Sequence, residues 1–277
     1  MLDLQTVEML EKKAKEIRIS TIHEIAHLGK GHIGGAMSIV EILTYLYYHE
    51  MRINPKNPKM EGRDRFVCSK GHAGPSVYAT LADKGYFPAD WLLTLNKGGT
   101  NLPSHCDMTK TPGVDFTTGS LGQGASAAAG IALGQKIKGE DSYTYLIVGD
   151  GESQEGQIWE MAEFASTHKL GNLIAFTDFN RMQLDGYTKD VINMDNIDTR
   201  WLGFNWHVQR INGHDFEQLD YAVQQAKAAK DRPSMIICDT VKSRGYLPGV
   251  GVVANHSMAV SEDDEKKAVQ ALEGGAV

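Results

Sequence analysis

The segment YTYLIVGDGESQEGQIWEMAEFASTHKLGNLIAFTDFNRMQLDG, residues 143–186, decides the fold. Residues 143–148 form a β-branched and aromatic run that stops at a glycine, and residues 173–179 form a second such run. Between them, residues 155–169 carry apolar side chains at helical spacing. Two parallel strands joined by a helix form a βαβ unit, and the loops after such strands are where these sheets bind ligands.

The rest of the chain continues to alternate between strands and helices. We expect helices over residues 4–26, 38–48, from about 121, 216–230 and 261–272, and strands over residues 65–69, 206–211 and 234–240. Ser38 is expected to cap the second helix, with Glu41 three residues later. This order predicts an α/β fold with a doubly wound, mainly parallel sheet and helices on both faces. No linker rich in Pro, Gly or Ser interrupts the sequence, so residues 1–277 are interpreted as one domain.

Composition excludes several classes of partner. A net charge of −7 without a long Lys/Arg block argues against nucleic acid and anionic membranes. The apolar runs are shorter than the roughly 20 residues that span a bilayer. Cys68, Cys106 and Cys238 show no C-x-x-C spacing, and the charged N-terminal stretch does not resemble a signal peptide. We therefore expect a cytoplasmic protein.

The loops that follow the two strands carry side chains suited to a metal and an anion. Asp150 stands between Gly149 and Gly151, so a bulky anion can approach the backbone while the carboxylate reaches a cation beside it. Asn180 follows the next strand, thirty residues later. Carboxylate and amide oxygens suit Mg²⁺ or Ca²⁺, and Mg²⁺ often adds phosphate oxygens to one or two carboxylates. The pattern therefore predicts a diphosphate bridged to the protein by a divalent ion.

The amino-acid sequence around these loops resembles that of a known protein family. G-D-G followed some thirty residues later by Asn is similar to the thiamine-diphosphate motif. Four blocks, RDRFVCSKGHAGP (63–75), TPGVDFTTGSLGQG (111–124), GDGESQEGQIWE (149–160) and DFNRMQLDG (178–186), look like transketolase, in particular the N-terminal subunit of the two-chain type. The resemblance extends from about residue 32 to residue 256. It implies the diphosphate-binding half of a thiamine-diphosphate enzyme.

The resemblance also implies roles for individual residues. The cofactor would be contacted by His72, Gly119, Leu121, Gly149, Gly151 and Asn180, and the metal would be held by Asp150, Asn180 and the backbone carbonyl of Met182. His32, His105 and His256 would face the substrate and act in catalysis, as a neutral imidazole can move a proton near pH 7. Glu155 matches a carboxylate near the subunit interface. Its alternative role is that of an acid stabilised by a helix N-terminus.

The expected reaction is transfer of a two-carbon ketol unit from a ketose to an aldose. The pyrimidine-binding domain of the family, with its activating Glu, is absent here, so the resemblance implies a C-terminal partner subunit, in an assembly of two chains of each kind. The sequence reads Ser104-His105-Cys106 where the family usually has G-H-P, and His256-Ser257-Met258-Ala259 where it usually has H-G-K-A. These departures leave open whether the donor is a ketose phosphate or a modified ketose, such as a sulfonated or branched one.

Other interpretations remain at this point. His23-Glu24-Ile25-Ala26-His27 fits the H-E-x-x-H pattern of zinc peptidases, although Lys30 and Ile33 stand where the extended pattern requires Gly and His. The α subunit of a 2-oxo-acid dehydrogenase would share G-D-G and Asn, but should lack the TGSLGQG and SKGHAGP blocks. A non-catalytic thiamine-diphosphate-binding or regulatory subunit would keep the cofactor ligands without the reaction.

Overall fold

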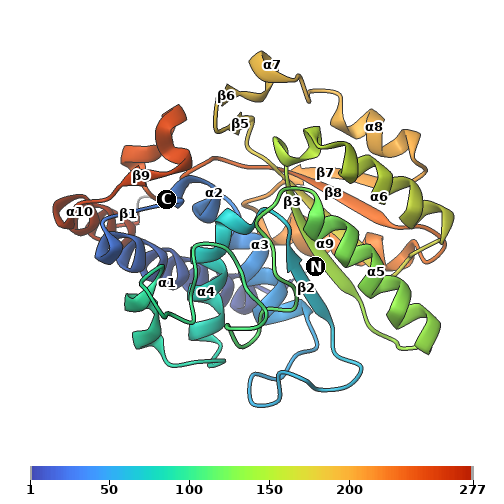
Figure 1. Cartoon of the computed structure of the whole chain (residues 1–277), viewed down its shortest axis with the longest axis horizontal. Coiled ribbons are helices and arrows are strands. Elements are labelled where there is room, and N and C mark those ends of the chain that lie inside the picture. The colour runs from blue at the N-terminus through green and yellow to red at the C-terminus, as the bar shows by residue number, and fades with distance from the viewer. Residues whose placement is uncertain (1, 276–277) are drawn as a thin grey trace.

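A five-stranded parallel sheet forms the centre of the molecule (Figure 1). The computed structural model describes residues 2–275. In sheet order, the strands are β2 (Arg65–Cys68), β3 (Thr144–Gly149), β4 (Leu173–Phe179), β8 (Ser234–Asp239) and β7 (His207–Asn212). Every neighbouring pair is parallel. The predicted strands are confirmed to within one or two residues at each end.

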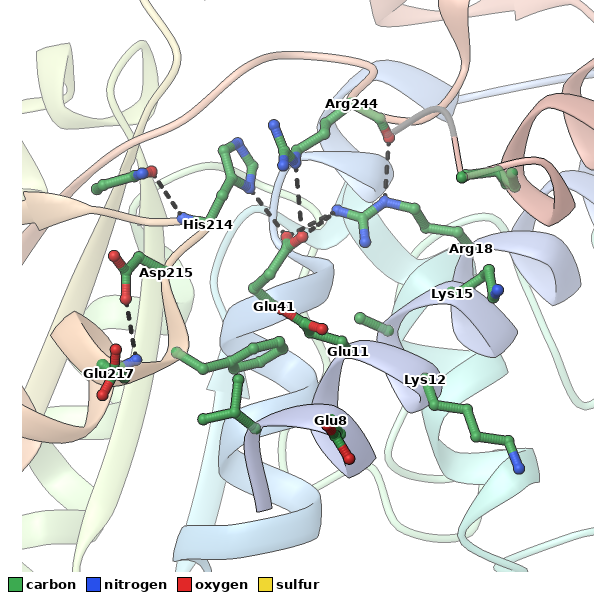
Figure 2. A pocket seen from close by; sticks show the side chains of 16 residues that line it. Glu8, Glu11, Lys12, Lys15, Arg18, Glu41, His214, Asp215, Glu217 and Arg244 are labelled. Atoms are coloured by element: carbon green, nitrogen blue, oxygen red, sulfur yellow. Dashed lines mark hydrogen bonds and ion pairs between the residues drawn. The ribbon is translucent and has the colours of Figure 1, made fainter. Parts of the chain in front are cut away.

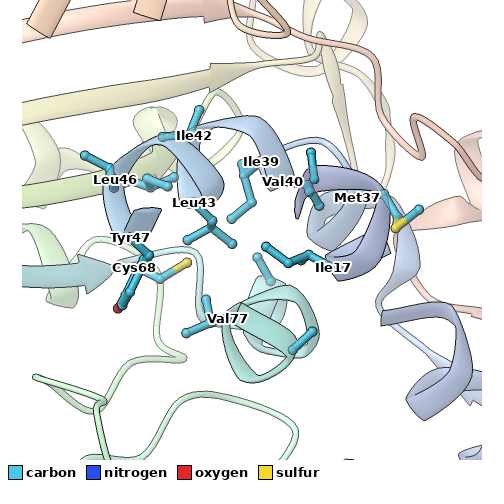
Figure 3. Packing of buried hydrophobic residues seen from close by; sticks show 14 of the residues in the cluster. Ile17, Met37, Ile39, Val40, Ile42, Leu43, Leu46, Tyr47, Cys68 and Val77 are labelled. Atoms are coloured by element: carbon cyan, nitrogen blue, oxygen red, sulfur yellow. The ribbon is translucent and has the colours of Figure 1, made fainter. Parts of the chain in front are cut away.

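Helices cover both faces of this sheet, because its strands present apolar side chains alternately to either side. Tyr145 and Ile147 pack in one core cluster, whereas Leu146 and Val148 pack in the other. The first cluster, part of which Figure 3 shows, includes residues of α1 (Leu4–Leu28), α3 (Val40–Tyr45), α4 (Gly74–Asp83) and α9 (Phe216–Ala228). The second includes α5 (Gln123–Lys138), α6 (Gly156–Thr167) and α8 (Ile197–Gly203). The doubly wound arrangement is confirmed.

Small paired strands and short helices connect these layers. β1 (Lys30–Gly31) pairs with β9 (Met258–Ala259), and β5 (Met182–Gln183) pairs with β6 (Gly186–Tyr187), both antiparallel. The remaining α-helices are α2 (Ile33–Met37), α7 (Thr188–Val191) and α10 (Glu262–Glu273). Short 3₁₀ helices cover Gly71–Ala73, Ala89–Thr94, Glu152–Gln154, Leu247–Gly249 and Val253–His256, and a π-helical turn covers Leu46–Glu50.

The prediction for residues 38–48 was wrong in one respect. This stretch is not one helix capped by Ser38; α2 and α3 meet there, and Leu46–Glu50 continues as a π-helical turn. The Ser38 hydroxyl is buried and donates to Asp178 Oδ2 at 2.7 Å, so it is engaged by β4 and does not cap a helix. By contrast, Ser261, which was predicted as the first residue of the last helix, caps α10 in a reciprocal pair with Asp264.

Two further expectations concern the environment of the chain. Within residues 2–275, none of the helices combines the length and the apolar character needed to cross a membrane. Cys68, Cys106 and Cys238 are all free and buried. The thiols are therefore part of the packed interior, and burial raises the pKa of each.

Candidate active site

Four adjacent strands deliver polar side chains to one edge of the sheet. Lys70 and His72 follow β2, Asp150 follows β3, Asn180 follows β4 and Lys242 follows β8. Because β2, β3, β4 and β8 are parallel neighbours, their carboxyl ends meet at the same edge. The site is thus a direct consequence of the strand order.

These loops enclose a cleft of about 360 Å³. Every residue to which the family resemblance gave a role lines this cleft: His32, His72, His105, Gly119, Leu121, Gly149, Asp150, Gly151, Glu155, Asn180, Met182 and His256. The residues predicted from the sequence therefore lie around one cleft in the structure, although they are spread from the start of α2 to the C-terminal quarter of the chain. Their individual roles stay predictions.

Four histidines form the wall of the cleft next to α2. The ring centroid of His32 lies 5.8 Å from that of His72, 5.6 Å from that of His105 and 5.5 Å from that of His256. Burial lowers the pKa of all four, and it does so most strongly for His72, which also lies near the charge of Lys70. The pKa of His256 falls to about 4. At neutral pH the four rings are uncharged and can each donate and accept a hydrogen bond.

Asp150 and Asn180 line the cleft at the ends of β3 and β4. Asp150 is buried, and its carboxylate accepts hydrogen bonds from the backbone N–H groups of Gly151 and Arg181. Burial, together with the nearby charge of Asp178, raises the pKa of Asp150 to about 7. The Asn180 amide nitrogen donates to Asp178 Oδ2 at 2.9 Å, which orients the amide. Asp150 is thus a buried carboxyl group that a bound cation would stabilise in its charged form.

Two buried lysines complete the site, and the sequence analysis missed both. Lys70 Nζ lies 2.5 Å from Asp178 Oδ2 and donates to Gly35 O at 2.9 Å. Lys242 Nζ donates to Met182 O at 3.4 Å, and burial and the like charge of Lys70 lower the pKa of Lys242 to about 8. Lys70 stands inside the SKGHAGP block and could have been noticed there. Lys242 has no glycine-rich or motif context, so only the packing of the loop after β8 identifies it.

Glu152 is a third functional candidate that the sequence analysis missed. Its buried carboxylate accepts hydrogen bonds from Ser69 Oγ at 2.5 Å, Gly122 N at 2.9 Å and Gly149 N at 3.0 Å. One side chain therefore ties together the loops after β2 and β3 and the turn before α5. The signal was present as a carboxylate directly after G-D-G.

The residues present fit a diphosphate with a divalent ion. Lys70 already pairs with Asp178, whereas Lys242 forms no ion pair with any residue among 2–275 and lies near the like charge of Lys70. A bound anion would therefore offset the charge of Lys242. Glycine keeps the space open, as a Cβ on Gly35 would lie 3.2 Å from Lys70 Nζ and one on Gly151 would lie 2.9 Å from Gln183 Cβ. Among residues 2–275 there is no cluster of three His, Cys, Asp or Glu side chains that could hold a metal alone. A metal here would need phosphate oxygens to complete its shell.

The zinc-peptidase interpretation is wrong. His23 forms an ion pair with Glu265 on α10, and His27 Nε2 lies 2.8 Å from Lys97 Nζ. Glu24 is fully buried, and burial raises its pKa well above the usual value. The three side chains therefore lie in three different environments and do not form a shared metal site.

A larger hollow of about 730 Å³ lies between α1 and the start of α9 (Figure 2). None of the predicted site residues lines it. Its most buried charges are already paired, because Glu41 accepts from Arg18 Nη2 at 2.6 Å and lies 2.9 Å from His214 Nδ1. We therefore place the candidate active site in the smaller cleft, where the predicted site residues meet and where Lys242 forms no ion pair with any residue among 2–275.

Comparison with known proteins agrees with this placement. Residues 9–274 match the family model "Transketolase, thiamine diphosphate binding domain". The chain is 51% identical over 264 residues to a 6-deoxy-6-sulfo-D-fructose transketolase subunit from Clostridium sp. (strain MSTE9), covering 95% of this chain and 96% of that one. It is 37% identical to one of the apulose-4-phosphate transketolase subunits of Actinobacillus succinogenes, covering 95% of each chain.

Solved structures give the same result. Transketolase from Campylobacter jejuni superposes with a TM-score of 0.90 at 30% identity, covering 98% of this chain. This chain spans only 43% of the length of that one. The matches in sequence and structure thus cover nearly all of the described residues, including every strand that supplies the cleft. The chain belongs to the transketolase family and corresponds to its thiamine-diphosphate-binding N-terminal part.

Proposed function

We propose that this chain is the diphosphate-binding subunit of a split transketolase, which transfers a two-carbon ketol unit from a ketose to an aldose. The observation that carries this proposal is the cleft itself, where four adjacent strand ends bring together two buried lysines, a buried carboxylate and His72, and other loops add the remaining three histidines. The rival α subunit of a 2-oxo-acid dehydrogenase is disfavoured, because the family match is to transketolase.

In this proposal the metal, Mg²⁺ or Ca²⁺, is held by Asp150, the Asn180 side chain and the carbonyl of Met182. The glycines that flank Asp150 and the ring of His72 approach the diphosphate, and Lys70 and Lys242 offset its charge. Gly119 and Leu121 would contact the rings of the cofactor. Both oxygens of Asp150 already accept backbone N–H groups, so the carboxylate is held in place before a metal arrives.

The histidines would handle the sugar. Thiamine diphosphate, when bound, supplies the nucleophilic carbon and the electron sink that C–C cleavage beside a ketone requires. His32, His105 and His256 would hold the sugar hydroxyls and move the proton of the hydroxyl that becomes a carbonyl on cleavage. Their lowered pKa values support this role, since an uncharged ring can accept that proton at neutral pH.

The site is expected to be complete only with a partner. The two relatives described above are both named as subunits. We infer a C-terminal subunit that supplies the pyrimidine-binding domain, in an assembly of two chains of each kind, with Glu155 and α5 near the interface. Glu155 and Leu121 are both exposed in the isolated chain, which is in line with a surface that a partner covers. The free, buried thiols suit a reducing cytoplasm.

The donor is proposed to be a ketose with a charged group at the end remote from the carbonyl. The relatives' names include a sulfonated fructose and a sugar phosphate. Both substrates carry an anionic tetrahedral group, which we take as the shared chemistry for this chain. Assays with a sulfonated and a phosphorylated ketose distinguish the two groups.

A two-component assay tests the function. The purified chain is mixed with thiamine diphosphate, Mg²⁺ and a panel of ketose donors, with and without a candidate C-terminal subunit, and the released aldose is measured. We expect ketol transfer only from the mixture. If the chain alone transferred the ketol unit as fast as the mixture, the split-enzyme proposal would be refuted. If the chain bound the C-terminal subunit but the mixture accepted none of the ketose donors, the proposed reaction would be refuted.

A further inference from the structure

The loop after β4 holds one residue in an uncommon backbone conformation. Asn180 and Arg181 connect β4 to Met182 at the start of β5, and Arg181 has a φ of 63°. Residues with a side chain rarely adopt a positive φ, and those that do are held there by their surroundings. Asn180 and Met182 line the active-site cleft, whereas Arg181 does not. The contacts of the Arg181 side chain therefore lie outside the cleft.

The backbone groups of Arg181 connect this loop to residues beside the cleft. Its N–H donates to Asp150 Oδ2 at 2.5 Å, and its carbonyl accepts from Thr188 N at 3.0 Å. Next to it, the Met182 N–H donates to Asn180 Oδ1 at 3.0 Å. The directions of these groups depend on the backbone angles at Arg181. The conformation of this one residue therefore affects how Asp150, Asn180 and Met182 lie relative to one another.

The Arg181 side chain belongs to a group that we call the Arg–Asp cluster, which consists of Phe179, Arg181, Asp198, Arg210 and Asp239. Arg181 Nη2 donates to Asp239 Oδ1 at 2.5 Å. Arg210 donates to the same carboxylate from Nε at 2.8 Å and from Nη2 at 2.9 Å, and its Nη1 donates to Asp198 Oδ2 at 2.8 Å. Arg210 lies on β7, Asp239 ends β8 and Asp198 lies on α8. The cluster therefore connects the loop after β4 to two neighbouring strands and a helix.

The aromatic ring of Phe179 adds a second kind of contact to the cluster. The guanidinium carbons of Arg181 and Arg210 each lie 4.7 Å from its ring centroid. An aromatic ring attracts a guanidinium group, so this contact and the ion pair with Asp239 both fix the Arg181 side chain. The side chains of Arg181 and Asp239 are 48% and 35% exposed, and ion pairs at such exposure contribute little to the free energy of unfolding. The cluster is therefore better suited to fixing a local conformation than to stabilising the whole fold.

We propose that the Arg–Asp cluster positions the proposed metal site, with Asp239 holding Arg181 in the conformation that arranges the metal ligands before a divalent ion binds. This inference rests on the function proposed above. A loop that is ordered before binding loses less conformational entropy when the ligand arrives, so affinity is higher. None of the five cluster residues lines the cleft, so they act on the metal only through the loop.

Two variants with opposite changes in charge test this role in the complex with the C-terminal subunit. Asp239→Asn removes a negative charge and Arg181→Gln removes a positive one, and each breaks the same ion pair. Calorimetric titration at a fixed excess of thiamine diphosphate gives the apparent Kd of Mg²⁺. We expect both variants to raise this Kd about tenfold, as is usual when a group that orients a metal ligand is removed. The change in charge alone would instead make Arg181→Gln bind the cation more tightly.

A matched control and two further readouts accompany these variants. Asp231→Asn breaks the exposed ion pair with Arg232 just before β8, away from the cleft, and its Kd should stay within about twofold of wild type. The Tm of every variant should stay within about 3 °C of wild type. Without cofactor, hydrogen exchange at residues 180–183 should be faster in Asp239→Asn, because the loop opens more often. Arg210→Gln leaves the pair of Arg181 and Asp239 in place and should show a smaller change of the same kind.

The outcomes separate this inference from the proposed function. A higher Kd in both Asp239→Asn and Arg181→Gln, with faster exchange confined to the loop, supports it. Unchanged or tighter Mg²⁺ binding in Arg181→Gln, or an equal loss in Asp231→Asn, overturns it. A lower Tm with faster exchange throughout the chain also overturns it, because the cluster would then only stabilise the fold. If the wild-type complex binds no thiamine diphosphate, the proposed function fails, and hydrogen exchange still decides whether the cluster holds the loop. Unchanged exchange at residues 180–183 in Asp239→Asn and Arg210→Gln would then overturn that role.

Discussion

Replacing Glu152 with Gln should destabilise the fold and the cofactor site together. The wild-type carboxylate accepts three hydrogen bonds, from Ser69, Gly122 and Gly149. Gln keeps the shape of the side chain but turns one oxygen into an N–H₂ donor. The Gly122 and Gly149 N–H groups cannot reverse, so at least one of them would face a donor or lose its acceptor.

The size of the effect depends on two opposing contributions. Burial raises the pKa of Glu152, because removing the charged carboxylate from water costs free energy. Gln carries no charge, so this desolvation cost disappears in the variant. Against this, hydrogen bonds to a charged group contribute about 1.5–3 kcal/mol each, and a buried donor left unpaired costs about 1–3 kcal/mol. With three such bonds affected, we expect a net loss of about 2 kcal/mol. At about 2–4 °C per kcal/mol for a chain of this size, Tm should fall by about 4–8 °C.

Urea unfolding and calorimetry of the purified chain measure this change, with Glu160→Gln on the exposed face of α6 as the control. Thiamine-diphosphate titration of the complete complex provides a second readout, because the loops that Glu152 connects flank the proposed diphosphate site. An unfolding free energy within about 0.5 kcal/mol of wild type, the usual range for surface substitutions, would refute the reasoning. A more stable variant would show that the cost of burying the charge exceeds the contribution of its hydrogen bonds.

Two further predictions concern other buried carboxylates. Asp150→Ala should weaken binding of thiamine diphosphate with Mg²⁺ at least tenfold in calorimetric titration of the complex, because a charged ligand of the proposed metal would be lost; Asp185→Ala, at an exposed position in the same cleft, is the control. Unchanged affinity in Asp150→Ala, or after chelation of the metal, would rule out the metal assignment. Burial alone would raise the pKa of Glu41, but Arg18 and His214 lower it from 4.5 to about 2 (Figure 2). This group therefore contributes about 3 kcal/mol of stability above pH 4.5, lost as pH falls towards 2. Urea unfolding from pH 6 to pH 2.5 should show a shallower decline for Glu41→Gln than for wild type and for the exposed control Glu8→Gln, and parallel curves would contradict the linkage.

Much of the fold could be predicted because its signals are local. The strand that became β4 was predicted at its observed bounds, and the βαβ unit around Asp150 was identified from apolar runs, helical spacing and glycine. The same holds for the cleft. Asp150, Asn180 and His72 stand just after such runs, and the ends of parallel strands meet at one edge of the sheet.

The side-chain interactions between residues that are distant in the sequence could be known only from the tertiary structure. Lys70 meets Asp178 across 108 residues, and Ser38 reaches the same carboxylate across 140 residues, which replaces its expected role as a helix cap. His23 and His27 fit a zinc motif by spacing alone, but long-range contacts direct them to Glu265 and Lys97. The sequence by itself determined the α/β fold, the family and the polar residues in the loops after β3 and β4. Only the folded chain decided which buried charges are paired, because electrostatic energy depends on distance in space and on burial, and spacing along the chain specifies neither.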